Sequence, residues 1–336
     1  MHGIKRTRQS PELILARKQR EQAKVADYLA LTSQVLSRKK QNDLSEDALR
    51  LTDKLLQVNP EFYTVWNYRR NIFLNGLFPH RTPEKIIELL YDDLDMTMGA
   101  LKTHPKVYWI WNHRRWCLEN IPSGPAPAGE EDANGWKQAA WQKDLFVVEQ
   151  MLNKDPRNFH AWDYRRYILS QIPKPPLPKT ELAYTKAKIV SNFSNFSAWH
   201  QRSKILLSLW SSGNLDESKS KENEFKLITD AMYTDPHDQS VWIYHRWLVG
   251  NNSTRKVLER EISVISDLLA EQPDSKWCLE SLVHYKRMLI NSYKDAVDAQ
   301  ALTDECHALL LQLSEIDPMR SRRYKDIMSQ LNNHDV

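Results

Sequence analysis

The 336-residue sequence predicts an all-α fold: a right-handed α-α superhelix, that is, a solenoid of stacked helical hairpins. Three observations predict this class. A phrase that combines proline, tryptophan and arginine recurs along the chain, apolar residues around each tryptophan follow helical spacing, and glycine is scarce. Self-similarity of this kind is typical of repeat proteins, in which each unit buries its apolar face against its neighbours. We therefore expect a single helical-repeat domain over residues 1–336.

The recurring phrase consists of a turn, a tryptophan and an arginine one helical turn later. It reads NPEFYTVWNYRR at 59–70 and DPRNFHAWDYRR at 155–166, and in four copies the proline lies six residues before the tryptophan. The repeats are centred on Trp66, Trp111, Trp162, Trp199, Trp242 and Trp277, at separations of 45, 51, 37, 43 and 35 residues. A degenerate copy near Tyr324 keeps the Asp-Pro pair.

Each repeat is expected to be a helix, a short turn and a second helix. Residues at +3 and +7 from a tryptophan lie within about 60° of it on a helix. The positions at −1 and +7 are apolar in five copies: Val65, Ile110, Ala161, Ala198 and Val241, then Phe73, Leu118, Leu169, Leu206 and Val249. A second helical pattern, such as Leu51, Leu55 and Leu56, precedes the turn. The helix cap is either the Asp or Asn before the proline or the residue four before the tryptophan, and both remain open.

The elements follow in order. Residues 1–24 predict an amphipathic, solvated first helix, and 25–58 a helix pair with Arg38, Lys39 and Lys40 in its loop. The first tryptophan helix is expected to end near Gly76, and residues 82–103 to form the next helix. Three stretches predict loops by composition: 122–135, rich in Pro and Gly; 172–180, a stiff connector; and the polar stretch 211–224. The 14 residues of the first stretch account for the single spacing of 51.

Composition excludes several classes of protein. Eight glycines favour long helices over β-hairpins. No stretch approaches the roughly 18 apolar residues of a membrane span, and the start lacks the apolar core of a signal peptide, so we expect a cytoplasmic protein. Three cysteines predict neither a disulfide framework nor a Cys-x-x-Cys zinc site. A net charge of +4 is too weak to indicate nucleic-acid binding.

Arginines recur close to the buried face of the repeats. Those at +3 are Arg69, Arg114, Arg165 and Arg202, and those at +4 are Arg70, Arg115, Arg166 and Arg246. A charge this near an apolar stripe is rarely left unpaired, because its desolvation is costly. The arginines form either an internal ladder to carboxylates or carbonyls, or a basic strip that docks an acidic surface or a phosphate. The sequence leaves both open.

The second repeat differs from the others. Lys106 lies five residues before Trp111, where the other copies have Glu61, Arg157, Ser194 and His237. A lysine at a helix start, beside the Tyr108 hydroxyl, is suited to meet a diphosphate as a point charge, although the pattern taken alone favours an exposed surface lysine. Nucleophile and phosphate-loop motifs are missing. Three functions therefore compete: a scaffold, an enzyme subunit whose chemistry lies in a partner chain, and, least favoured, an autonomous enzyme.

The W-[NHD]-[YHQ]-R repeats resemble those of the protein prenyltransferase α-subunit family, over roughly residues 1–325. Within that family, several phrases resemble the α subunits of Rab geranylgeranyltransferase: the MHG start, RNFHAWDYRR, NFSNFSAWH, DPHDQSVWIYHRWLVG, PDSKWCL and IDPMR. Larger members carry an immunoglobulin-like insert and a leucine-rich tail. Because Gly250 passes almost directly into the next predicted helix, the chain resembles the compact, fungal-type form.

This resemblance implies a heterodimer. The α subunit of such an enzyme wraps around a β subunit, which holds a zinc ion and the lipid pocket. The zinc activates a C-terminal cysteine of a Rab GTPase, which is presented by the Rab escort protein and attacks geranylgeranyl diphosphate. The chain itself is then expected to bind no cofactor. The alternatives are the α subunit of a farnesyltransferase or type I geranylgeranyltransferase, and a non-catalytic scaffold like a tetratricopeptide array.

The resemblance also implies a site. The family contributes a Lys-x-Tyr pair to the diphosphate site, and Lys106 and Tyr108 match that pair. Trp109 departs from the small or polar residue that is usual between this pair and the repeat tryptophan, which puts the local shape of the pocket in doubt. His2 is a candidate N-terminal ligand to the partner's zinc.

A second group of residues is expected to support activity through the subunit interface. Arg114, Asn158 and Trp162 match such positions of the family. We place the other arginines at +3 in the same supporting group: Arg69, Arg165 and Arg202.

Overall fold

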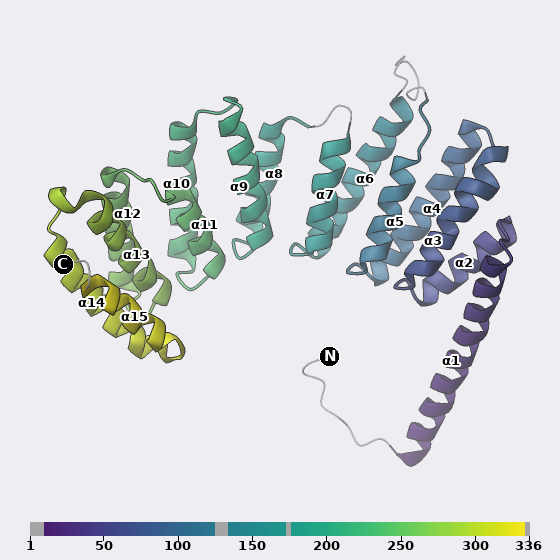
Figure 1. Ribbon diagram of the computed structural model, residues 1–336, viewed down its shortest axis with the longest axis horizontal. Coiled ribbons are helices and arrows are strands. Elements are labelled where there is room, and N and C mark those ends of the chain that lie inside the picture. The colour runs from purple at the N-terminus through teal and green to yellow at the C-terminus, as the bar shows by residue number, and fades with distance from the viewer. Residues whose placement is uncertain (1–9, 125–133, 173–175, 333–336) are drawn as a thin grey trace. The chain divides into compact units, whose positions relative to one another are not determined.

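The structure is a computed structural model that describes residues 10–124, 134–172 and 176–332 (Figure 1). Those residues form α-helices joined by short turns, with one isolated bridge between Gly124 and Asn134 in place of any sheet, which confirms the predicted all-α class. None of these helices combines the length and the apolar character needed to cross a bilayer. The chain divides into two compact units, Met1–Pro175 and Pro176–Val336, which are described in turn.

The first unit consists of one long helix followed by three hairpins. Its helices are α1 (Pro11–Lys40), α2 (Glu46–Val58), α3 (Tyr63–Asn71), α4 (Pro83–Thr103), α5 (Tyr108–Glu119), α6 (Gly135–Lys154) and α7 (Phe159–Gln171). Helix α1 packs on α2, and the hairpins are α2/α3, α4/α5 and α6/α7. Contacts from α3 to α5 and from α5 to α7 stack the second helices of the hairpins in one layer.

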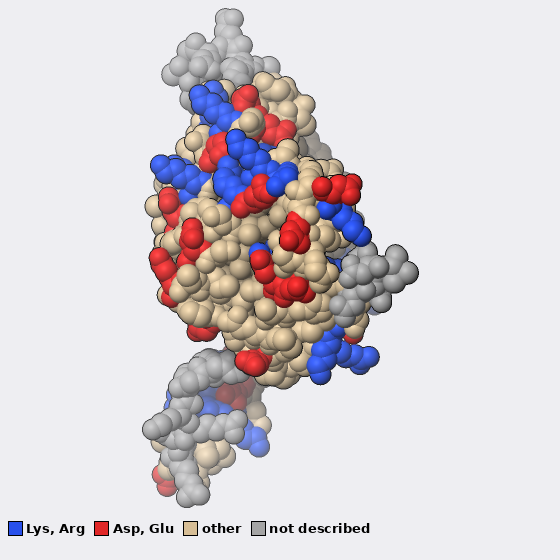
Figure 2. Space-filling model, turned by 90° about the vertical axis from the view of Figure 1, so that its left-hand side faces the viewer, with Lys and Arg blue, Asp and Glu red and all other residues tan. Residues whose placement is uncertain are grey.

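The second unit continues the pattern with four hairpins. Its helices are α8 (Pro178–Ser191), α9 (Phe196–Ser211), α10 (Glu217–Thr234), α11 (Gln239–Val249), α12 (Arg255–Glu271), α13 (Lys276–Tyr293), α14 (Ala299–Ile316) and α15 (Ser321–Asn332). On the face seen in Figure 2, basic and acidic side chains lie next to one another. Exposed ion pairs of this unit, such as Arg255–Glu259 at 2.7 Å, contribute little to stability.

A hydrogen bond explains why the proline and the tryptophan keep their spacing. In five hairpins the indole Nε1 donates to the carbonyl oxygen six residues earlier, at 2.7 to 2.9 Å. The donors are Trp66, Trp111, Trp162, Trp199 and Trp242, and each is at most 4% exposed. The indole therefore fills the core with its ring and closes the inter-helix turn with its N–H, which satisfies the polar end of a buried aromatic.

The structure decides between the two predicted caps. The second helices begin after Asn158, Asn195 and Asp238, whose side chains accept backbone N–H bonds at the helix start. The prolines lie in the turn and not at the first helical position. The residues before the prolines make a different contact: Asp155 Oδ1 accepts from the Arg157 N–H at 3.3 Å, an Asx-turn that helps to end the first helix.

The sixth hairpin is shifted by two residues from its predicted centre. Trp277 is only half-buried, with the Lys276 ammonium over its ring, whereas Leu279 is fully buried. Leu279 lies six residues after Pro273, the spacing that the tryptophans of the other hairpins keep. The half-buried Trp277 had concealed this register, because a tryptophan is a stronger signal in a sequence than a leucine.

Three predicted boundaries change. Helix α1 runs without a break to Lys40, so that residues 25–40 belong to it and the predicted basic loop is its last turn. Helix α10 starts at Glu217, inside the predicted polar loop, and α8 starts at Pro178, inside the predicted connector. Most of the predicted insertion, residues 125–133, lies outside the described residues. After α3 the chain continues as a π-helical turn, where Gly76 approaches Leu44 so closely that a Cβ would lie 2.4 Å from its carbonyl oxygen.

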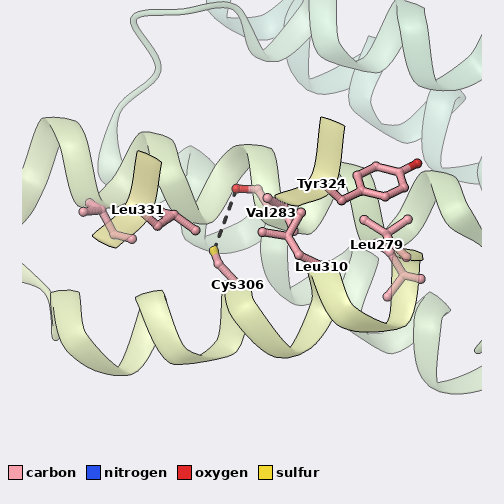
Figure 3. Packing of buried hydrophobic residues seen from close by; sticks show 8 residues of the cluster. Leu279, Val283, Cys306, Leu310, Tyr324 and Leu331 are labelled. Atoms are coloured by element: carbon pink, nitrogen blue, oxygen red, sulfur yellow. Dashed lines mark hydrogen bonds between the residues drawn. The ribbon is translucent and has the colours of Figure 1, made fainter. Parts of the chain in front are cut away.

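The last hairpins share one apolar core. It contains Leu279 and Val283 of α13, Cys306 and Leu310 of α14, and Tyr324 of α15 (Figure 3). Tyr324 lies six residues after Pro318 and is 1% exposed, so it occupies the place that tryptophan has elsewhere. Its hydroxyl donates to Glu280 Oε1 or Asp317 Oδ2, each at 3.1 Å.

Candidate functional site

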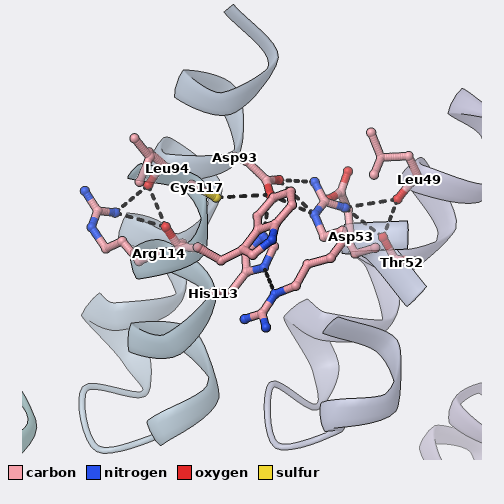
Figure 4. A network of polar contacts seen from close by, with 12 residues as sticks. Leu49, Thr52, Asp53, Asp93, Leu94, His113, Arg114 and Cys117 are labelled. Atoms are coloured by element: carbon pink, nitrogen blue, oxygen red, sulfur yellow. Dashed lines mark hydrogen bonds and ion pairs between the residues drawn. The ribbon is translucent and has the colours of Figure 1, made fainter. Parts of the chain in front are cut away.

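The arginine at +3 in the first repeat is buried in an internal ion-pair network. Arg69 is 3% exposed, and its Nε donates to the two carboxylate oxygens of Asp93 at 2.8 and 3.1 Å (Figure 4). Its Nη1 reaches Thr52 Oγ1 at 2.7 Å and Asp53 Oδ1 at 2.6 Å. His113 of the next repeat contacts the same Asp93 carboxylate at 2.5 Å. One carboxylate of α4 is thus held by the second helices of two neighbouring hairpins.

The same arrangement returns in two further repeats. Arg114 Nε donates to both oxygens of Asp144 at 2.8 and 3.1 Å, and the Tyr164 hydroxyl of the next hairpin donates to the same carboxylate. In the second unit Arg202 binds the two oxygens of Glu224 at 2.7 and 2.6 Å, and Tyr244 donates to it at 2.7 Å. These arginines therefore form the internal ladder and not an exposed basic strip.

The other arginines of the repeats vary this pattern. Arg165 is buried and binds Glu149 of its own hairpin at 2.9 Å. At +4, Arg70 donates to His113 Nδ1 at 3.2 Å and to Asn112 Oδ1 at 2.7 Å. Arg115 is exposed and lies over the Tyr167 ring, 3.6 Å from its centroid.

Electrostatics favour the charged form of Asp93 and the neutral form of His113. Burial alone raises the pKa of the Asp93 carboxyl, but the Arg69 guanidinium and His113 outweigh it and hold that pKa well below its usual range. Burial lowers the pKa of His113, against the opposing effect of Asp93. A neutral ring with its proton on Nε2 satisfies both neighbours, because Nε2 donates to Asp93 and Nδ1 accepts from Arg70.

Asp93, His113 and Cys117 have ligand atoms within 4.8 Å of one another, a grouping of metal-ligating residue types. Both oxygens of Asp93 are already bonded to Arg69, whose positive charge opposes a cation. Burial also raises the pKa of the Cys117 thiol well above its usual value, which disfavours the thiolate that a metal requires. The cluster therefore fits a hydrogen-bond network and does not fit a zinc site.

Lys106 and Tyr108 lie at the N-terminal end of α5, and both are exposed. The Lys106 side chain is 69% exposed, and its Nζ lies 3.3 Å from Asp155 Oδ2 in the next turn. Tyr108 is the first residue of α5 and is 52% exposed. The N-cap of α5 is Val107, whose apolar side chain makes no capping hydrogen bond to the first N–H groups of the helix. A helix N-terminus of this kind adds to the attraction for an anion.

Tyr108 belongs to a row of contacting aromatic side chains. Ring centroids lie 5.4 Å apart from Tyr63 to Trp109, 5.3 Å from Trp109 to Tyr108, 6.2 Å from Tyr108 to His160 and 4.0 Å from His160 to Phe159. We call these five residues the aromatic rim. Tyr63, Tyr108 and Phe159 are each the first residue of their helix, so the rim follows the N-terminal ends of α3, α5 and α7.

Asn158 joins the turn that carries Lys106 to the next hairpin. Its Nδ2 donates to the Pro105 carbonyl at 3.0 Å, the oxygen that also accepts from Trp111 Nε1. Its Oδ1 caps α7 by accepting the His160 and Ala161 N–H groups at 3.1 and 3.3 Å. The second unit repeats this arrangement, because Ser275 caps α13 and donates to the Pro236 carbonyl at 3.0 Å.

Replacement of Asn158 separates its two contacts. We expect Asn158→Ala to lower the free energy of unfolding by about 1–2 kcal/mol, since it loses the cap. Asn158→Asp keeps the cap but turns an acceptor toward the Pro105 carbonyl, so it should preserve α7 while loosening the turn of Lys106. Chemical denaturation measures the stability of both variants. Equal stability of Asn158→Ala and the wild type would contradict the assigned cap.

The predicted site residues fall into two groups. The exposed Lys106 and Tyr108 and the buried Asn158 lie together near the N-terminal ends of α5 and α7, whereas Trp162 and the four arginines at +3 are buried elsewhere in the repeats. His2 lies outside the described residues. Sequence reasoning missed His160, whose pKa is lowered by burial against the effect of a hydrogen bond with the Lys106 backbone. The sequence did contain a signal for the aromatic rim as a whole. Four repeats have an aromatic residue three before the tryptophan: Tyr63, Tyr108, Phe159 and Phe196.

Comparison with known proteins adds the family. Five segments match the protein prenyltransferase alpha subunit repeat: residues 45–76, 90–121, 141–172, 178–209 and 221–252. The geranylgeranyl transferase type-2 subunit alpha of Schizosaccharomyces pombe is 38% identical over 99% of this chain and 99% of its own length. The chain belongs to the family of geranylgeranyl transferase type-2 α subunits. The Saccharomyces cerevisiae member is 34% identical over 98% of this chain and 99% of its own length.

Structural similarity agrees with this family. A chain in the structure titled Candida albicans protein geranylgeranyltransferase-I complexed with GGPP superposes with a TM-score of 0.69, covering 91% of each chain at 22% identity. At that identity the likeness shows the fold alone, an α-α superhelix. The five matched repeat segments hold the five hairpins in which tryptophan closes the turn, so the family pattern corresponds to the indole hydrogen bond.

Proposed function

We propose that this chain is the α subunit of a heterodimer that transfers geranylgeranyl from geranylgeranyl diphosphate to C-terminal cysteines of Rab GTPases. In the transfer a carbon–sulfur bond forms, the carbon–oxygen bond to the diphosphate breaks, and the thiol proton is lost. The proposed part of this chain is to bind the diphosphate end of the lipid with Lys106 and Tyr108. The relatives named as type-2 α subunits match the chain over 99% of their own length, which supports its assignment as an α subunit.

The observation that carries the proposal is the exposure of Lys106 and Tyr108 together at the N-terminal end of α5. The arginines at +3 are buried against carboxylates, so they are not available to an external anion. Lys106 forms a direct but solvent-exposed ion pair with Asp155, and such an exposed pair contributes about 0–1 kcal/mol. Exchange of Asp155 for a diphosphate oxygen therefore costs little.

The proposed chemistry of Lys106 and Tyr108 is stabilisation of the leaving group. Negative charge grows on the diphosphate as its bond to carbon breaks, and a positioned ammonium and phenol O–H stabilise that charge more than they stabilise the bound substrate. The N-terminal end of α5, which carries the positive end of the helix dipole, adds to this stabilisation. In the aromatic rim the Tyr108 ring contacts the rings of Trp109 and His160.

The remaining parts of the reaction are assigned to other chains. The described residues of this chain supply no set that fits zinc, so the proposed zinc belongs to the partner β subunit, as does the lipid pocket. Rab recognition is proposed to involve the escort protein, and the proposed location is the cytoplasm, where Rab GTPases are modified. In this proposal the chain has no activity of its own.

Reconstitution of the full chain with a prenyltransferase β subunit tests the proposal. We expect transfer to a Rab substrate that depends on both subunits and on the escort protein. The matched repeat is that of protein prenyltransferase alpha subunits in general, so the second candidate is the α subunit of a farnesyl or type I transferase. That candidate requires transfer to a short CaaX peptide without an escort protein. Assembly with the β subunit but no transfer to either substrate would contradict both.

A further inference from the structure

A small pocket opens between four helices of the second unit, α11, α13, α14 and α15. Its volume is about 70 Å³, which is enough for several water molecules or for one small charged group. Three arginines from three different helices line it: Arg246 of α11, Arg287 of α13 and Arg323 of α15. Because these guanidinium groups come from separate helices, the packing of the fold brings their positive charges together, and no single segment does so.

The acids around this pocket do not balance the arginines. Glu280 is the one carboxylate among its lining residues, and it accepts from the Tyr324 hydroxyl at 3.1 Å. Arg323 approaches Glu280 only to 3.8 Å, and Arg287 donates to the neutral Gln330 side chain at 3.0 Å. Arg246 interacts with the Tyr285 hydroxyl. Two of the three guanidinium groups therefore have neutral partners, and each retains N–H donors for a further acceptor.

Burial and the same excess of positive charge lower the pKa of His284. His284 lines the pocket beside Arg246 and Arg287. Burial, then the charges of those two arginines, lowers the pKa of His284 to about 4. The imidazole is thus neutral at physiological pH, so it is available as a hydrogen-bond donor or acceptor without adding to the repulsion.

The floor of the pocket is apolar. Val283, Leu310 and Leu313 line it, and they belong to the core of the last hairpins (Figure 3). A free inorganic anion has no apolar atoms that could pack against these side chains. A carboxylate side chain has a methylene stem that packs on the floor while its oxygens meet two guanidinium forks, which suit the planar geometry of a carboxylate. Arginine beside a small apolar pocket is also typical of binding hot spots.

We infer that this pocket of Arg246, Arg287 and His284 receives a carboxylate side chain of the partner β subunit and so anchors the second unit of this chain in the heterodimer. The inference rests on the proposed function, because it requires that a partner subunit exists. We favour an acidic protein side chain over a free phosphate because the pocket is positively charged, is small and has an apolar floor.

The double variant Arg246→Glu/Arg287→Glu tests the inference in the complete heterodimer. We expect its dissociation constant to rise roughly 30-fold or more, because the introduced carboxylates repel the partner's acid and leave it without a counter-charge. The matched control is Arg255→Glu/Lys256→Glu, which makes the same charge change at exposed positions of α12 in the same unit and should stay within about twofold. Both variants should reach the wild-type turnover at saturating partner. Equal affinity of the pocket variant and the wild type would overturn the inference.

A cross-link identifies the occupant. In the Arg287→Lys variant, a carbodiimide should join the introduced amine to an Asp or Glu of the β subunit, as read by mass spectrometry of the complex. A cross-link to the Rab or to the escort protein instead would overturn the assignment of the partner. If the wild-type chain forms no heterodimer at all, the proposed function has failed. If the wild type assembles and transfers geranylgeranyl, and the pocket variant assembles equally well, only the pocket inference has failed.

Discussion

Replacement of Lys106 by alanine is expected to lower the turnover number of the reconstituted heterodimer roughly 100-fold, the usual loss when one group that stabilises transition-state charge is removed. The effect falls on turnover more than on substrate binding, since the charge that Lys106 meets grows as the diphosphate leaves. Folding should not change, because the side chain is 69% exposed and its one ion pair is with Asp155. Single-turnover transfer by the saturated complex measures the effect.

Two matched variants isolate the role of Lys106. Lys102→Ala removes an exposed lysine at the end of α4, four residues before Lys106, and should leave turnover unchanged. Asp155→Asn removes the ion-pair partner of Lys106 without removing the ammonium, so it should keep most of the activity. Wild-type turnover of the Lys106→Ala complex would remove this residue from the site. An equal loss in Asp155→Asn would mean that the ion pair itself matters, and not the free ammonium.

Asp93→Asn should destabilise the chain by about 3 kcal/mol, because it leaves a buried guanidinium with less than its full counter-charge. Asp93 is 1% exposed and is bonded to Arg69 and His113, and the remaining partner Asp53 keeps the loss at the low end of the range for broken buried pairs. The control is Asp95→Asn on the same helix, at an aspartate whose side chain is 73% exposed, which should change stability by less than about 0.5 kcal/mol. Chemical denaturation measures both. Equal effects at the two positions would contradict the buried ladder.

The same carboxyl makes the ladder sensitive to acid. Arg69 and His113 hold the pKa of Asp93 below its unfolded value despite burial, so its contribution to folding is complete above an unfolded pKa of about 4. The contribution falls as pH drops below that value, since the unfolded state then binds the proton first. The stability difference between wild type and Asp93→Asn should therefore shrink from pH 7 to pH 3. A constant difference over that range would show that Asp93 carries no depressed pKa.

The hairpins could be predicted from the sequence because their signal is local. The proline, the tryptophan and the apolar positions around it lie within one turn and one helix, and the indole hydrogen bond spans six residues in each of five hairpins. The cap positions were also visible, but two candidates three residues apart competed until the backbone decided between them. Leu279 was concealed because the more conspicuous Trp277 lies two residues away.

The carboxylates of the ladder could not be predicted from their spacing to the arginines. Arg69 meets an acid 24 residues later, Arg114 one 30 residues later and Arg202 one 22 residues later. The separation changes because loops of different length intervene, whereas the place of the acid on the first helix of the next hairpin stays the same. Counted from the tryptophan of its own hairpin, each acid lies 18 residues earlier: Asp93 before Trp111, Asp144 before Trp162 and Glu224 before Trp242. The sequence therefore contained a signal for the partners, which counting from the arginines concealed.

The candidate site was predicted in part. Lys106 was distinguished by its difference from the other repeats, and the family resemblance assigned it to the diphosphate. Its proximity to Asp155, the link from Asn158 to Pro105 and the aromatic rim depend on contacts between hairpins about 50 residues apart in the sequence. Such contacts follow from the stacking of the repeats, which the pattern of a single hairpin does not contain.

A structure of the reconstituted heterodimer with geranylgeranyl diphosphate is the most direct test of the central claim, that this chain completes a site belonging in part to its partner. We expect Lys106 Nζ to leave Asp155 and to lie within about 3 Å of a diphosphate oxygen, with the Tyr108 hydroxyl on the same group. A diphosphate bound entirely by the partner, with Lys106 still paired to Asp155 and facing solvent, would contradict the account.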